Sequence, residues 1–232
     1  MSVLARRVTA EFVGTALLVM AVVGSGVMAT RLSPDDAGLQ LLQNSLATGA
    51  ALVALIVALQ PVSASFNPVV TLVERALGML DRRTAMSLIG AQIGGGVAGT
   101  IAANLMFGLD AVTASAHERT GPGLWLGEII ATVGLLLVVF GTVRSGRADR
   151  VAFAVGGYIT AAYWFTSSTS FANPAVTIAR TVTDSFAGIA PSSVPAFILA
   201  QVAGGAAGFL LVRFLYPTLA TSAVADDRKV RS

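Results

Sequence analysis

Long apolar stretches separated by short polar segments dominate the hydropathy pattern of the chain. About 20 apolar residues cross the hydrocarbon core of a bilayer. Stretches of about this length lie near residues 8–30, 42–61, 84–107, 123–143, 150–168 and 195–216. The segments between them contain charges and turn-forming residues such as Pro34 and Pro122. The pattern therefore predicts an all-α integral membrane protein with six transmembrane helices.

Two further apolar segments are too short to cross a membrane. They span residues 65–73 and 170–179 and carry the triplets Asn67-Pro68-Val69 and Asn173-Pro174-Ala175. Asn is a favoured helix N-cap, and Pro is tolerated at the first helical position because its missing N–H would have no partner there. We therefore expect two re-entrant half-helices that begin near the middle of the membrane.

An internal repeat relates the two halves of the chain. Glu11 near the start of the first span matches Glu128 in the fourth, the Asn-Pro segments match each other, and Gln92 matches Gln201. Three landmarks in the same order predict one domain over residues 1–232 that is built from two repeats, about 8–107 and about 123–216. Because each repeat has an odd number of full spans, the repeats should be inverted relative to each other in the membrane.

Composition and charge narrow the possible functions. Charged residues make up 12% of the chain, against about 25% in soluble domains. Cysteine is absent and His117 is the single histidine, so thiol chemistry and thiolate metal sites are excluded, and we expect His117 to be a solvated loop residue. No nucleophile or metal constellation is apparent, which argues against an enzyme and against a cofactor.

Most Lys and Arg residues lie near the N-terminus, in segments 74–83 and 144–150, and in the C-terminal tail. The positive-inside rule therefore predicts that both termini are cytoplasmic. Basic residues that flank apolar spans serve topology, so the net charge of +3 gives no reason to expect a nucleic-acid partner.

With these motifs in place, nearly the whole chain resembles the aquaporin and glycerol-facilitator family, the major intrinsic proteins. The resemblance rests on the segment Ala10–Thr15, on the two Asn-Pro motifs and on six spans in two inverted halves. It implies a passive channel in the cell (inner or plasma) membrane. It also implies a homotetramer in which each subunit surrounds its own pore, without a cofactor.

The residues themselves support a pore. Two half-helices that meet at their N-terminal ends bring the positive ends of their dipoles together, which disfavours cations. The amides of Asn67 and Asn173 are expected to donate hydrogen bonds to a passing oxygen. Glu11 and Glu128 lie inside apolar spans; by analogy with the family they accept hydrogen bonds from the re-entrant loops, and the alternative is a proton-carrying role. We expect Gln92 and Gln201 to give similar structural support.

One position departs from the family pattern. Family members usually have an arginine directly after the second Asn-Pro-Ala, where this chain has Val176. Arg180 lies about one helical turn further along; we expect it to anchor a loop, although it could instead reach back to the pore. The expected filter positions are Thr48, Ala162 (or Ala161), Phe171 and Val176.

Such a filter would be wide, weakly polar and uncharged, which argues against strict water selectivity. Bacterial family members associated with arsenic resistance are similar in having Val and Thr at two of these places. The sequence therefore predicts passage of metalloid hydroxides such as arsenite, of glycerol, or of both, together with water. The alternatives are an ordinary water or glycerol channel without a metalloid role and, less favoured, an ion-coupled transporter. Val69, which replaces the family alanine, is either a compensated packing change or a slight narrowing of the centre.

Overall fold

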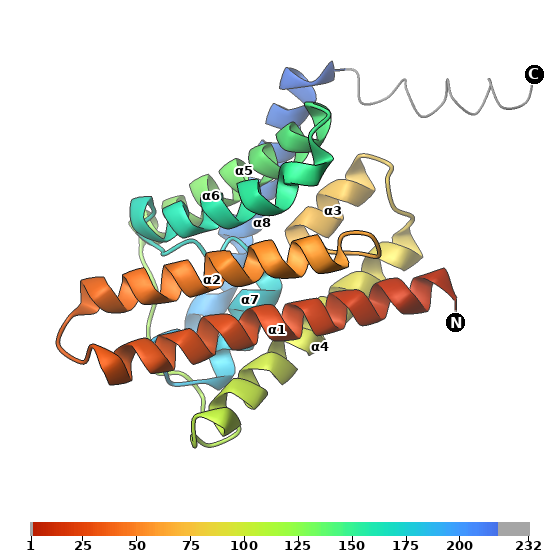
Figure 1. The fold of residues 1–232 in the computed structure, drawn as a ribbon. Coiled ribbons are helices and arrows are strands. Elements are labelled where there is room, and N and C mark those ends of the chain that lie inside the picture. The colour runs from red at the N-terminus through yellow and green to blue at the C-terminus, as the bar shows by residue number, and fades with distance from the viewer. Residues whose placement is uncertain (1, 218–232) are drawn as a thin grey trace, which may run out of the picture.

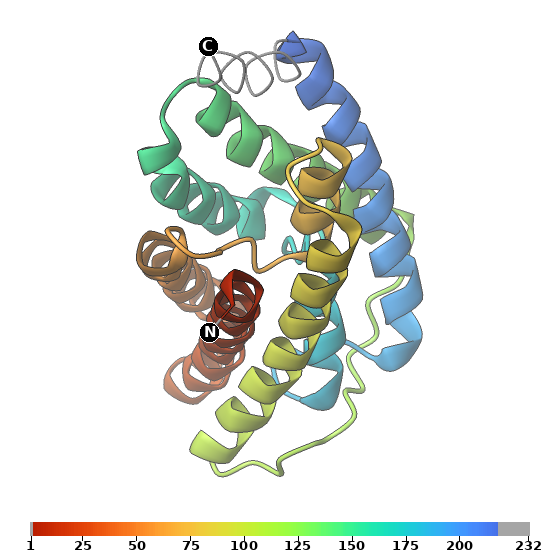
Figure 2. The ribbon, with the colours of Figure 1, turned by 90° about the vertical axis from the view of Figure 1, so that its right-hand side faces the viewer.

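The computed structural model describes residues 2–217, and within them it contains helices and no strand (Figures 1 and 2). The α-helices are α1 (Val3–Leu32), α2 (Ala37–Leu59), α3 (Pro68–Ala76), α4 (Arg82–Met106), α5 (Pro122–Arg144), α6 (Val151–Phe165), α7 (Pro174–Ala179) and α8 (Val194–Leu215). Short 3-10 turns occupy Ala148–Arg150, Arg180–Val182 and Pro191–Ser193. The all-α prediction is confirmed.

Five of these helices, α1, α2, α4, α5 and the segment Pro191–Leu215, are long and apolar enough to cross a membrane. The fifth predicted span, 150–168, is shorter than expected because α6 ends at Phe165, where Thr166 takes an extended conformation (φ −105°, ψ 137°). The remaining helices, α3 and α7, are the two predicted half-helices. The chain is therefore a multi-pass membrane protein with two short helices between its long ones.

Side-chain caps define where several helices begin. The Asp36 carboxylate accepts a hydrogen bond from the Leu39 amide at the start of α2, and Asp81 accepts one from Thr84 at the start of α4. At the half-helices the cap is Asn67 or Asn173, followed in each case by a proline at the first helical position. The asparagine cap and the proline that follows it therefore fix the start of each half-helix.

Glycines allow three pairs of long helices to approach closely. A Cβ on Gly95 or Gly99 of α4 would collide with the backbone of α1, and one on Gly204 of α8 would lie 2.7 Å from the Ile129 carbonyl oxygen of α5. Gly49 of α2 and Gly156 of α6 meet in the same way. Small residues at such crossings are typical of helix packing in membranes, where apolar side chains gain nothing by leaving lipid.

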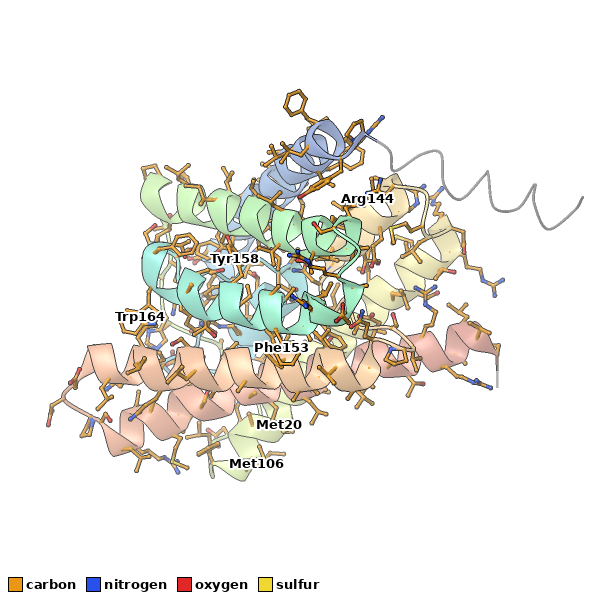
Figure 3. All side chains as sticks on the ribbon, turned by 45° about the horizontal axis from the view of Figure 1, so that its top comes forward. Met20, Met106, Arg144, Phe153, Tyr158 and Trp164 are labelled. Atoms are coloured by element: carbon orange, nitrogen blue, oxygen red, sulfur yellow. The ribbon has the colours of Figure 1, made fainter. Side chains whose placement is uncertain are left out.

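Large apolar side chains cover the outside of the bundle. Phe153, Trp164 and Phe214 are at least half exposed, as expected of surfaces that face lipid. Figure 3 shows Trp164 near the end of α6, where it approaches α2, and its indole N–H donates to the Ser45 hydroxyl over 3.2 Å. Tyr158 lies between α5 and α6 and donates to the Ala131 carbonyl oxygen over 3.1 Å.

The half-helices lie inside the bundle. Figure 2 shows α7 behind α3 and α4, within the ring formed by the long helices, and α3 and α7 contact each other. The N-terminus of α1 and the Arg144 end of α5 lie on the same side of the molecule (Figures 1 and 3). The basic residues of segment 218–232, on which the predicted orientation partly rests, lie outside the described residues.

Candidate functional site

The two asparagines of the Asn-Pro motifs hold the re-entrant loops together. Asn67 donates from Nδ2 to the carbonyl oxygen of Ala172 over 2.7 Å, and Asn173 donates from Nδ2 to the carbonyl oxygen of Phe66 over 2.7 Å. Each loop therefore supplies the donor for one bond and the acceptor for the other. The two half-helix N-termini are fixed against each other by this reciprocal pair.

The same two side chains cap their own helices. Oδ1 of Asn67 accepts from the Val69 amide at 2.9 Å, and Oδ1 of Asn173 accepts from the Ala175 amide at 3.0 Å. A primary amide has two N–H groups, and one of them is used in the bond to the opposite loop. Because both asparagines line the internal cavity, the second N–H of each is available to a molecule inside it.

Strained backbone turns the acceptor carbonyls toward the asparagines. Phe66 has φ +48° and Ala172 has φ +45°, a region that side chains other than glycine rarely adopt. Their backbone N–H groups donate to Oε2 of Glu11 over 2.7 Å and to Oε2 of Glu128 over 2.8 Å. Each carboxylate thus binds the amide of the strained residue, and these bonds offset the cost of its conformation.

Both glutamates have further hydrogen-bond partners. Glu11 accepts from the Ser63 hydroxyl at 2.6 Å and from the Ser65 amide at 2.9 Å, whereas Glu128 accepts from the Phe171 amide at 2.9 Å. Gln92 and Gln201 donate to Glu11 and Glu128 over 2.8 and 2.6 Å. Both carboxylates are fully buried, and neither lines the cavity. This geometry is that of an internal acceptor for the amides of the re-entrant loops.

One cavity of about 280 Å³ passes the two asparagines. Its walls include every fourth residue along two helices, namely Thr48, Leu52 and Ile56 of α2 with its C-cap Gln60, and Val151, Val155, Ile159 and Tyr163 of α6. Residues four apart lie on one face of a helix, so each helix presents a single, mainly apolar stripe. Arg7 and Gln60 lie toward one end of the cavity, and Thr48, Tyr163 and Arg180 lie toward the other.

Three of the four expected filter residues line this cavity, namely Thr48, Phe171 and Val176. The structure does not bring Ala162 to it: that side chain is fully buried elsewhere, and Ala161 is exposed outside the cavity. Tyr163 occupies the wall instead, with its hydroxyl oxygen 3.2 Å from the Thr48 hydroxyl oxygen. The four-residue spacing from Val151 through Val155 and Ile159 is the sequence signal that leads to Tyr163.

Val69 packs away from the cavity. Its side chain is 2% exposed, and a Cβ on Gly205 of α8 would lie 2.7 Å from its Cγ1. The larger side chain is thus accommodated by a glycine on the neighbouring helix. Of the two interpretations of Val69, this contact corresponds to compensated packing.

Arg180 combines the two roles considered for it. Its Nε donates to the carbonyl oxygen of Ala187, which anchors the loop after α7, and the residue also lines the cavity. The guanidinium carbon lies 3.5 Å from the centre of the Phe171 ring. Sequence reasoning did not foresee this contact because it depends on the fold of two separate loops.

A second arginine approaches the same ring from the loop between α4 and α5. The guanidinium carbon of Arg119 is 5.1 Å from the Phe171 ring centre, and its Nε donates to the Gly188 carbonyl oxygen over 2.9 Å. Burial lowers the pKa of Arg119 below its ordinary value, and the charge of Glu128 opposes that shift. His117 is half exposed in this loop, 3.7 Å from Asp184. Residues 2–217 contain no cluster of His, Cys, Asp and Glu that could hold a metal ion.

Comparison with known proteins identifies related chains. A family model described as Major intrinsic protein matches residues 1–152 and 146–230. A protein named aquaglyceroporin AqpS, from Rhizobium meliloti (strain 1021), is 49% identical over 213 residues, which is 91% of each chain. The X-ray structure of the aquaglyceroporin from Plasmodium falciparum aligns with a TM-score of 0.72 and 18% identity, over 93% of this chain and 98% of that one. The last match supports the fold alone.

Proposed function

The chain belongs to the major intrinsic protein family, and we propose that it is an aquaglyceroporin-type channel that conducts small neutral solutes such as glycerol and water. The observation that carries this proposal is one cavity that passes both Asn67 and Asn173, each with an amide N–H left for a solute. A permeating molecule with hydroxyl groups would replace its hydrogen bonds to water with hydrogen bonds from these amides. The 49% identical relative that is named an aquaglyceroporin supports the same solute class.

The outer end of the cavity favours solutes larger than water. Thr48 and Tyr163 offer hydroxyl groups there, whereas Phe171 and Val176 offer apolar surface. A polyol, or a neutral metalloid hydroxide such as arsenous acid, has oxygens that can hydrogen-bond to Thr48 and Tyr163. The rest of such a molecule can pack against the apolar side chains of Phe171 and Val176. With Val176 in place of an arginine, we propose that arsenite and glycerol pass together with water.

Two other functions make different predictions. An ordinary water or glycerol channel without a metalloid role would exclude arsenous acid while passing glycerol. An ion-coupled transporter would share the inverted repeats and broken helices, but its flux would depend on an ion gradient. Glu11 and Glu128 lie outside the cavity, so neither carboxylate is placed to bind a coupling ion inside it, and this position favours a channel.

The proposal extends to orientation and assembly. The basic segments near the N-terminus and at 144–150 support cytoplasmic termini in the cell membrane. Family membership supports a homotetramer in which every subunit has its own pore. Exposed apolar residues such as Phe153 and Leu199 supply surface for lipid or for neighbouring subunits.

Stopped-flow light scattering on proteoliposomes tests the solute range. Vesicles that contain the protein should swell faster than empty vesicles in gradients of water, glycerol and arsenous acid. Accelerated water flux without glycerol or arsenous acid uptake would overturn the proposal of a wide filter. Accelerated glycerol uptake without arsenous acid uptake would favour the channel that has no metalloid role.

A further inference from the structure

The cavity contains a fixed positive charge that the residue after the second Asn-Pro-Ala does not supply. Arg180 follows Val176 by four residues, which corresponds to about one helical turn, or about 5.4 Å along the axis. Both residues line the cavity, together with Thr48 and Tyr163. The backbone of Arg180 therefore lies about one turn beyond position 176, and its guanidinium carbon contacts the ring of Phe171 in the loop before the half-helix.

Two contacts hold the Arg180 side chain in one orientation. Its Nε donates to the Ala187 carbonyl oxygen, and its guanidinium carbon lies over the Phe171 ring, 3.5 Å from the ring centre. A cation over an aromatic ring in a desolvated site is stabilised by its attraction to the ring face. A charge fixed in this way presents its donors to a solute with little loss of side-chain entropy on binding.

The terminal nitrogens of Arg180 remain available to a solute. Within residues 2–217, Nε is the atom of this side chain that donates to a protein acceptor. Neither terminal nitrogen is among the fully buried polar atoms that lack a partner, so both reach the cavity surface. The two groups carry four N–H donors in a planar fork.

The charge of Arg180 is not neutralised by a carboxylate among the described residues, where the ion pairs are His117 with Asp184 and Arg150 with Asp149. A fixed positive charge inside a narrow, poorly solvated passage repels cations more strongly than the same charge in water. Hydrogen bonds from a charged donor to a neutral hydroxyl oxygen are also stronger than neutral ones.

We propose that Arg180 is a specificity-determining residue of this pore, which supplies from one turn beyond Val176 both the cation barrier and the hydrogen-bond donors of the outer constriction. This inference rests on the proposed channel function. It separates two properties that a single arginine at position 176 would combine. Val176 leaves the wall at its own position apolar for bulky neutral solutes, while the charge that excludes cations is held against the Phe171 ring.

The absence of cysteine from the chain allows a direct test with Arg180→Cys. This variant places a single thiol in the cavity, and the thiolate exchanges with a methanethiosulfonate reagent to form a disulfide and release methanesulfinate. The aminoethyl reagent adds a positive charge, and the sulfonatoethyl reagent adds a negative one. The matched control is Arg213→Cys, because Arg213 also lies over a phenylalanine, Phe209 at 5.5 Å, but is exposed and does not line the cavity.

The readouts are glycerol uptake and potassium leak in proteoliposomes, with labelling verified by mass spectrometry. We expect Arg180→Cys to conduct glycerol and to leak potassium several-fold faster than the unchanged protein. Aminoethylation should return the leak toward the original value, sulfonatoethylation should raise it further, and neither reagent should affect Arg213→Cys. A potassium leak in Arg180→Cys that equals that of the unchanged protein, or that ignores the sign of the added charge, would overturn the inference.

A second pair of variants covers the case in which Arg180→Cys does not fold. Arg180→Lys keeps the charge and Arg180→Gln removes it, and both lose the same Nε bond to Ala187. A larger potassium leak in the Gln variant than in the Lys variant supports the inference, and equal leaks contradict it. If the unchanged protein conducts no glycerol, the proposed function fails. If it conducts glycerol and these variants keep its cation exclusion, the role of Arg180 alone fails.

Discussion

The guanidinium carbon of Arg180 lies 3.5 Å from the centre of the Phe171 ring, which joins a residue of the second half-helix segment to the loop that precedes it. Val176, where an arginine would be expected, lines the same cavity from one turn away. The outer end of the pore therefore has an apolar position and a charged position in sequence along its axis.

Phe171→Leu should weaken selectivity at the outer end. Loss of the ring removes the surface on which Arg180 is stacked and widens the passage, so the ratio of glycerol to water permeability should rise several-fold in stopped-flow measurements. Phe209→Leu is the matched control, since Phe209 lies under Arg213 away from the cavity. Equal ratios in the two variants would show that the ring does not shape the filter.

Val176→Arg should restrict large solutes more than water. A second guanidinium about one turn from Arg180 would fill apolar space beside Phe171, so glycerol and arsenous acid uptake should fall much further than water flux. Val176→Leu adds bulk without charge and should have a smaller effect. Equal inhibition of all three solutes, or no inhibition, would count against Val176 lining the constriction.

Asn67→Asp should admit cations. A carboxylate can still accept the Val69 amide hydrogen bond, but it cannot donate to the Ala172 carbonyl oxygen, and it adds a negative charge beside the cavity. Potassium leak should therefore rise while the half-helix keeps its cap. The control is Asn104→Asp, which makes the same change outside the cavity and loses the two hydrogen bonds that Asn104 donates to carbonyl oxygens. A leak of the same size in that variant would refute the pore-specific explanation.

Glu128→Gln should destabilise the second loop. The side-chain NH2 group of the new glutamine would face other donors, such as the backbone N–H of Ala172. A buried donor left without an acceptor lowers the stability of the folded protein by about 1–3 kcal/mol. We expect a lower midpoint of thermal unfolding in detergent, followed by circular dichroism. Glu118→Gln makes the same change at an exposed loop residue and should leave the midpoint unchanged. An unaffected Glu128→Gln would contradict the acceptor role.

Val69 and Gly205 should be energetically coupled. Gly205→Ala places a methyl group 2.7 Å from Val69 Cγ1 and should destabilise the protein, with overpacking of this kind costing about 1–3 kcal/mol. Val69→Ala in the same chain should restore most of the lost stability, and it should leave glycerol uptake unchanged because Val69 does not line the cavity. Additive losses in the double variant, or a changed glycerol rate, would disprove the packing interpretation.

Hydropathy and local helix signals predicted the part of this molecule that depends on sequence periodicity. The long helices, the half-helices that begin after Asn67 and Asn173, and the all-α class follow from apolar length and from Asn-Pro caps. The end of α6 at Phe165 did not follow, because the apolar pattern continues past it while the loop that reaches Asn173 needs extended backbone.

The details of the cavity wall were less predictable. Comparison with the family pattern led to Ala162 (or Ala161), whereas the four-residue stripe of α6 ends on Tyr163. The contact between Arg180 and Phe171 depends on the backbone of two loops, including the positive φ of +45° at Ala172. Such contacts arise from tertiary structure, and no short sequence pattern encodes them.

Glycerol uptake into proteoliposomes from which all ion gradients have been removed is the most direct test of a passive pore past Asn67 and Asn173. Equal ionic solutions on both sides, with ionophores present, remove any driving force except the glycerol gradient. A passive pore should keep uptake several-fold above that of empty vesicles and in proportion to the glycerol gradient. Uptake that falls to the rate of empty vesicles once the ion gradients are removed would contradict it.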